Sequence, residues 1–138
     1  MKPAKTFKVF GEAVDLLVDS AMSRGTAAAL IQTSSPGGGP PPHKHSNEDE
    51  TFTVLEGDFE FLQEGKWAPL SVGEVIFAPR GHIHTFRNAG TTVGRVLIFV
   101  SPSGLETYLQ KIGPLSPATD MPKIIEISNR YGITFHLP

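Results

Sequence analysis

The chain has 138 residues, which predicts one domain that is long enough to bury a hydrophobic core without disulfides. Its 12 basic and 14 acidic residues give a formal charge of −2, so the charge balance favours neither nucleic acid nor an anionic membrane surface as a partner, and a small-molecule ligand fits better. Because cysteine is absent, disulfides and thiolate metal sites are excluded.

Two further features of composition set expectations for location and fold class. Residues 1–5 are not followed by an apolar stretch of signal-peptide length, and no apolar run approaches the length of a membrane span. We therefore expect a cytoplasmic protein. The 14 glycines and 12 prolines separate short apolar runs, which favours many tight turns and an all-β barrel or sandwich.

The N-terminal part of the chain reads as strands that lead into a stiff segment. Residues 7–18 predict one or two short strands broken near Gly11, and residues 26–33 predict another strand. Residues 34–42 contain three consecutive glycines, which permit positive φ, and then three prolines, which forbid a helix. This segment therefore delivers His43 in an extended chain.

His43 and His45 are the first candidate metal ligands. Two residues apart on an extended strand, they project from the same face and can approach one ion together, while Lys44 points away. Glu50 follows as the first residue of a predicted strand and adds a hard carboxylate oxygen. Two imidazoles and a carboxylate at this spacing predict a metal site.

The middle of the chain predicts a β-meander. Residues 50–55 and 59–62 form strands joined by a turn, and a second turn leads towards Trp67. We expect Glu48 and Asp49, which precede the first of these strands, to be exposed turn carboxylates.

A further apolar run over residues 75–79 leads to two more histidines. His82 and His84 are also two residues apart, so spacing alone allows either to be the third nitrogen ligand. Three imidazoles and one carboxylate suit one divalent transition metal ion, namely Fe, Mn, Ni, Co, Zn or Cu. A six-coordinate ion would keep two positions for substrate, oxygen or water.

The C-terminal third combines a strong strand with helices. Residues 96–100 are apolar without interruption, which predicts a strand buried on both faces and a covering partner. Ser103 and Glu106 have the spacing of a capping box, before a helix over residues 104–112. A second helix is predicted over residues 121–131, with Asp120 as its N-cap.

Two spaced sets of residues in this chain resemble the signature motifs of the cupin superfamily. The first is Gly37-x5-His43-x-His45-x4-Glu50-x6-Gly57. The second is Gly73-x5-Pro79-x-Gly81-x2-His84-x3-Asn88. All ten fixed positions match, and residues 40–43 and 47–52 are similar to small single-domain cupins of the quercetin dioxygenase-like type.

The resemblance implies an all-β fold, an antiparallel double-stranded β-helix (jelly-roll or cupin barrel) with a short C-terminal helical appendage. The barrel would cover residues 1–113, with the motifs at 37–57 and 73–88, and residues 114–138 would form a helical extension packed on the same domain. The implied metal ligands are His43, His45, Glu50 and His84, so the motif selects His84 over His82. The resemblance also implies a homodimer.

Aromatic residues in phase with these ligands predict a largely apolar pocket. The expected lining is Phe52, Val54, Phe86, Phe77 and Phe99, with Phe59 and Phe61 as further candidates. No cluster of arginines suggests a phosphate site.

These features lead to one main functional hypothesis and two alternatives. The first is a metal-dependent dioxygenase-like enzyme, an oxidoreductase that acts on a small enolisable or aromatic diol substrate with Glu50 as catalytic base. The alternatives are a non-catalytic metal-dependent binding or sensor protein, and a metal-dependent isomerase or lyase.

Overall fold

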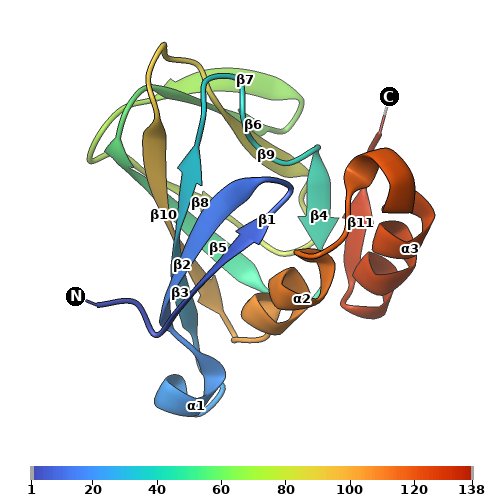
Figure 1. The fold of residues 1–138 in the computed structure, drawn as a ribbon. Helices are drawn as coiled ribbons and strands as arrows, with labels where there is room; N and C mark the ends of the chain where they lie inside the picture. Colours follow the sequence, from blue (N-terminus) through green and yellow to red (C-terminus); the bar gives the residue numbers. More distant parts are fainter. Residues whose placement is uncertain (1, 138) are drawn as a thin grey trace.

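Two antiparallel sheets face each other in the computed structural model, which describes residues 2–137 (Figure 1). The six-stranded sheet contains, in spatial order, β1 (Lys5–Val9), β2 (Glu12–Val18), β3 (Ala28–Ser34), β10 (Gly94–Ser101), β5 (Asp49–Glu56) and β8 (Val75–Ala78). The five-stranded sheet contains β11 (Ile133–Phe135), β4 (His43–His45), β9 (His84–Asn88), β6 (Phe59–Gln63) and β7 (Lys66–Leu70). The fold is the jelly-roll cupin barrel that the motifs predicted.

Strict alternation along the strands places the core between the sheets. In β5, Glu50, Phe52 and Val54 are buried, whereas the residues between them are more accessible. Because successive side chains of a strand point to opposite faces, the metal-ligand candidate and two core residues share the inner face of the barrel. Strand β10 alternates in the same way.

The prediction that residues 96–100 are buried on both faces was wrong. Val96, Ile98 and Val100 face the core, but the side chain of Phe99 is 47% exposed on the outer face. The apolar run therefore reflects the preference of these residues for β-strands and does not indicate burial on both faces. Within the described residues, Phe99 on the outer face of the sheet is not covered.

Within residues 2–137 the chain also forms three helices: α1 (Ser20–Ser23), α2 (Leu105–Ile112) and α3 (Pro117–Arg130). The first is a single turn that was not predicted, and its N-cap is Asp19. The predicted helix over 104–112 matches α2, but its N-cap is Gly104, so the expected capping box is incomplete. Glu106 still accepts a hydrogen bond from the Gly104 N–H at 2.6 Å.

The last helix begins earlier than predicted and contains a kink. Its N-cap is Ser116, and Asp120, the predicted N-cap, has non-helical φ and ψ angles at the kink. After α3 the chain forms β11, a short strand that was not predicted, which pairs with β4. Figure 1 shows α2 and α3 together at one end of the barrel, close to β4 and β11.

The glycines and the asparagine of the motifs join the segments that carry the histidines. The Gly37 N–H donates to the Asn88 carbonyl and the Asn88 N–H donates to the Gly38 carbonyl, both at 2.9 Å. Gly39 has φ of 151°, and a Cβ there would lie 2.0 Å from the Phe86 carbonyl oxygen. A side chain is therefore excluded where this segment crosses β9 on its way to His43.

No helix within residues 2–137 is long and apolar enough to cross a membrane.

Candidate metal centre

Strand β4 holds its two histidines between two other strands. Ile133 and Phe135 of β11 pair with His45 and His43, respectively. On the other side, His43 pairs with His84 of β9. The three imidazoles therefore come from neighbouring strands of one sheet, and their rings approach with centroids 4.7 to 5.5 Å apart.

Glu50 reaches the three imidazoles from β5 in the opposite sheet. One ligand atom from each of His43, His45, Glu50 and His84 lies within 4.8 Å of the others. The side chains of His45, Glu50 and His84 are buried, and His43 is half-buried. The structure thus brings together all four residues that the sequence predicted as ligands.

The Nδ1 atom of every histidine in this cluster is already engaged by the protein. His43 donates to the Pro41 carbonyl at 2.8 Å, His45 to Glu48 Oε1 at 2.7 Å, and His84 to the His82 carbonyl at 3.2 Å. Carbonyls and ionised carboxylates only accept hydrogen bonds, so each Nδ1 carries the proton. The Nε2 atoms are then left for a ligand, which is the arrangement found around protein metal ions.

The Nε2 atoms of His45 and His84 both lie 2.9 Å from Glu50 Oε1. The contact of His45 Nε2 is not aligned as a hydrogen bond, and within residues 2–137 this nitrogen is the buried side-chain N or O atom that has no partner. A nitrogen lone pair facing a carboxylate oxygen is unfavourable unless a proton or a cation lies between them. The donor set therefore fits a divalent transition metal ion.

Mutual charges shift the protonation of these groups. Burial disfavours ionisation of His45, but the charges of Glu50 and Glu48 and the hydrogen bond to Glu48 outweigh it and raise the pKa of His45 to about 10. Burial likewise opposes ionisation of Glu50, yet the charges of His45 and His84 and the hydrogen bond with His84 hold its pKa well below the usual range. Burial, with repulsion from His45 and His84, lowers the pKa of His43 to about 3.

Glu48 was misjudged from the sequence. Its exposed fraction is 6%, and its carboxylate orients His45. The neighbouring Asp49 faces outward and pairs with Arg80 at 3.1 Å, as expected for a surface carboxylate. The missed signal was the period of two, because Glu48 has the same phase as Glu50.

His82 does not join the cluster. Its side chain is exposed, and it contributes a backbone carbonyl that accepts from His84. The motif therefore selected the histidine that the structure places beside Glu50.

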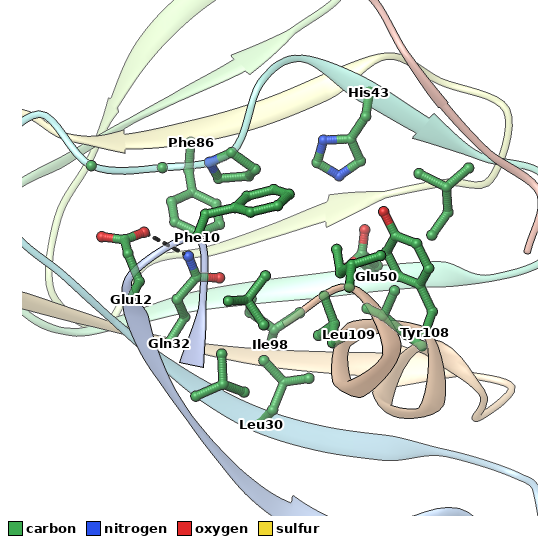
Figure 2. A pocket seen from close by; sticks show the side chains of 18 of the residues that line it. Phe10, Glu12, Leu30, Gln32, His43, Glu50, Phe86, Ile98, Tyr108 and Leu109 are labelled. Atoms are coloured by element: carbon green, nitrogen blue, oxygen red, sulfur yellow. Dashed lines mark hydrogen bonds between the residues drawn. The ribbon is translucent and has the colours of Figure 1, made fainter. Parts of the chain in front are cut away.

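The ligand cluster lies in a cavity of about 360 Å³ inside the barrel (Figure 2). Of the predicted lining residues, Phe52 and Phe86 contact this cavity. Val54, Phe59 and Phe61 are buried in the core but do not line it.

The expectation that Phe77 and Phe99 line the pocket was wrong. Their side chains are 56% and 47% exposed on the outer face of the six-stranded sheet. Each residue is followed or preceded in its strand by a side chain that points into the barrel. Because the residues of both faces are apolar, the sequence did not show which face Phe77 and Phe99 occupy.

Several lining residues come from elements that the spacing of the motifs does not report. Leu105, Tyr108, Leu109 and Ile112 of α2 form part of the wall. The helix was predicted, but its position against the barrel depends on tertiary packing. Another part of the wall, formed by Phe10 and Glu12, comes from the β1–β2 turn and the start of β2.

The comparisons with known proteins agree with this fold. A family model described as "Cupin domain" matches residues 30–100, slightly more than half of the chain. An uncharacterized protein from Aquifex aeolicus is 42% identical over 62 residues, which are 45% of this chain. The match spans 50% of that protein's length.

Two of the matches come from Thermotoga maritima. An oxalate-binding protein is 32% identical over 81 residues, which are 59% of this chain and 67% of that protein. The crystal structure of a predicted oxalate decarboxylase has a TM-score of 0.61 and 26% identity, and the match covers 71% of this chain and 90% of that one. With the family match, the two-sheet barrel and the clustered histidines and glutamate, the chain belongs to the cupin family.

Proposed function

We propose that this cupin is a metal-dependent dioxygenase-like enzyme that acts on a small substrate with an enolisable or aromatic diol oxygen. The observation that carries the proposal is the cluster of three imidazoles and one carboxylate, whose ligand atoms lie within 4.8 Å of one another in the lining of a mostly apolar cavity. Among the described residues that line this cavity, none is lysine or arginine. An acidic substrate oxygen would therefore have to be held at the metal centre.

We assign His43, His45, Glu50 and His84 as the residues that hold one divalent ion of Fe, Mn, Ni, Co, Zn or Cu. A bound ion would supply Lewis acidity to a substrate oxygen, and a redox-capable ion would also supply electron transfer. The hydrogen bonds on the three Nδ1 atoms keep the imidazoles in place.

The remaining groups of the cavity bind the substrate and move its proton. Phe52 and Phe86 offer apolar faces that orient a planar ligand and exclude water. We assign Glu50 as the base that accepts the proton of the substrate hydroxyl, because its carboxylate lies on the cavity wall beside the ligand nitrogens.

Oxygen uptake tests this proposal. Protein reconstituted separately with Fe(II), Mn(II), Ni(II), Co(II) or Cu(II) is expected to consume oxygen with flavonols, catechols or β-diketones, and with Zn(II) it is not. Glu50→Gln is expected to lose turnover, whereas Glu56→Gln, at the exposed end of the same strand, retains it. Ligand binding without oxygen uptake in every combination would contradict the enzyme and leave a binding protein.

One observation favours a second candidate, a cupin that binds a small dicarboxylate. It is the 32% identity with the Thermotoga maritima oxalate-binding protein. The absence of lysine and arginine from the described lining argues against it, since both carboxylates would depend on the metal centre. Calorimetric titration of the metal-loaded protein with oxalate and with catechol decides between the two ligand classes.

We also propose that the protein is a homodimer that pairs through the outer face of the six-stranded sheet. On this face Phe99 of β10 and Phe77 of β8 lie on either side of Thr51 in register. Val75, which is 63% exposed, lies two residues before Phe77 on the same face of β8. Such a contiguous apolar face is typical of a protein interface.

A further inference from the structure

The cavity has a second polar end, away from the metal-ligand cluster. Figure 2 shows Glu12 and Gln32 at one side of the cavity, with His43, Glu50 and Tyr108 at the other. The exposed lining residues Gly11, Ser35 and Gly39 gather near Glu12, so the cavity opens to solvent at this end. A ligand held at the metal centre would therefore direct its far end towards Glu12.

The carboxylate of Glu12 is held in place from one side. Its Oε1 accepts from Gln32 Nε2 at 2.9 Å and from the hydroxyl of Ser34 at 3.1 Å. Ser34 is fully buried, and Gln32 and Ser34 lie on the same face of β3. This support comes from the sheet itself, so the carboxylate is part of the rigid barrel.

The other carboxylate oxygen depends on a glycine. A Cβ at position 38 would lie 2.4 Å from Glu12 Oε2 and 2.9 Å from the Ser35 carbonyl oxygen. Gly38 thus leaves room for the carboxylate between β2 and the segment that leads to His43. This requirement accounts for one glycine of the run at 37–39 that metal ligation does not explain.

The groups at this end present hydrogen-bond acceptors to a ligand. Because the Gln32 amide donates its Nε2–H to Glu12, its carbonyl oxygen is left to accept. Glu12 takes part in none of the ion pairs formed within residues 2–137. A carboxylate without a cation at the mouth of an apolar cavity is a recognition group for a donor.

We propose that Glu12 and Gln32 form a distal recognition site that selects substrates with a hydrogen-bond-donating group, an ammonium or a hydroxyl, at the end opposite the metal-binding oxygen. The inference rests on the proposed function for the oxygen that anchors the ligand, and it adds the substrate class. That class is an apolar or aromatic body with an acidic oxygen at one end and a donor at the other. An ammonium group is favoured over a hydroxyl because it also balances the charge of the carboxylate.

The test is a calorimetric titration of zinc-loaded protein with 4-substituted catechols. Each compound carries a substituent of two or four carbons that ends in a methyl, hydroxyl, ammonium or carboxylate group. The catechol ring is the same in every compound. The ammonium compound is expected to bind about tenfold more tightly than the methyl compound, with the hydroxyl compound between them and the carboxylate compound weakest. Zinc prevents turnover, so affinity is measured separately from oxidation.

Variants locate this preference at the distal site. Glu12→Gln keeps the shape of the side chain and is expected to remove most of the preference for ammonium over methyl. Gly38→Ala displaces the same carboxylate from the other side and is expected to do the same. Asp15→Asn is the matched control. Asp15 lies on the same strand but on the opposite face, where its carboxylate accepts a hydrogen bond from the Thr6 hydroxyl. Thermal unfolding of each variant confirms that it is folded.

The outcomes separate this inference from the proposed function. Equal affinities for the four end groups, or a preference that survives Glu12→Gln in a folded protein, would overturn the distal site. An intact preference without oxygen uptake by any metal form would overturn the dioxygenase and leave the distal site standing. Failure of every catechol to bind would overturn both.

Discussion

Neighbouring residues of this barrel occupy opposite environments, and the chemistry follows the face. Glu48 is buried and bonded to His45, whereas Asp49, the next residue, pairs with Arg80 at the surface. Ile98 lines the cavity, whereas Phe99 is exposed on the outer face. Residue type alone does not separate the members of either pair, so the face decides whether a carboxylate or an apolar side chain serves the site.

The largest effect is expected for the strand that carries two of the ligands. His45→Ala removes a buried nitrogen and leaves Glu48 and Glu50 without their shared partner, so stoichiometric metal binding should be lost. Lys44→Ala, at the adjacent position, should retain the metal. Elemental analysis after dialysis measures both, and equal metal content in the two variants would contradict the assigned ligand set.

The pair of carboxylates at the start of β5, Glu48 and Asp49, sharpens the comparison. Glu48→Gln weakens the hydrogen bond that orients His45, and metal affinity should fall about 10- to 100-fold. Asp49→Asn disrupts an exposed ion pair, and affinity should change less than about twofold. Competition with a chromophoric chelator gives both values. A larger loss in Asp49→Asn than in Glu48→Gln would show that the inward carboxylate has no special role.

Metal binding should release a proton from the buried face. The pKa of His45 is raised to about 10, so the metal-free imidazole is protonated at neutral pH and an incoming ion must displace the proton on Nε2. His43, with a pKa near 3, releases none. Apparent affinity should therefore rise about tenfold per pH unit between pH 7 and 9.

Calorimetry in two buffers of different ionisation enthalpy counts the protons. About one proton is expected at pH 8. A value near zero would mean that His45 is already neutral in the metal-free protein, and that its contact with Glu50 is relieved in another way.

The smallest effect on folding is expected on the outer face. Ile98→Ala opens a space beside the cavity and should lower the free energy of unfolding by about 2–5 kcal/mol. Phe99→Ala should change it by less than about 1 kcal/mol, yet weaken the proposed dimer. Chemical denaturation and light scattering at micromolar concentration measure the two properties. A wild-type protein with monomer mass would refute the dimer.

Local periodicity predicted most of the strands and the shared face of His43 and His45, whereas the full ligand set followed from the resemblance to the cupin motifs. His43 and His45 share a face by the period of two, and the second motif identified His84 rather than His82. The fixed positions Gly37 and Asn88 prove to be joined by a backbone hydrogen bond. The motif match therefore marked segments that are distant in the sequence and meet in the fold.

Features that depend on packing between distant segments were not predicted. The position of the Glu12 carboxylate depends on hydrogen bonds from Gln32 and Ser34, which lie about twenty residues further along the chain. The face of Phe99 depends on which side of the sheet is covered. The strand β11 has three residues, which are too few to show a periodic signal.

The pairing of β11 with β4 links the lifetime of a bound ion to a remote part of the chain. Strand β4 has three residues, and its register with β9 is a single pair, His43 with His84, whereas all three of its residues pair with β11. Movement of β4 alone away from the barrel would therefore require its three pairs with β11 to break, as well as its one pair with β9. The rate of metal dissociation should therefore depend on the separation of β11 from β4, although β11 contributes no ligand to the site.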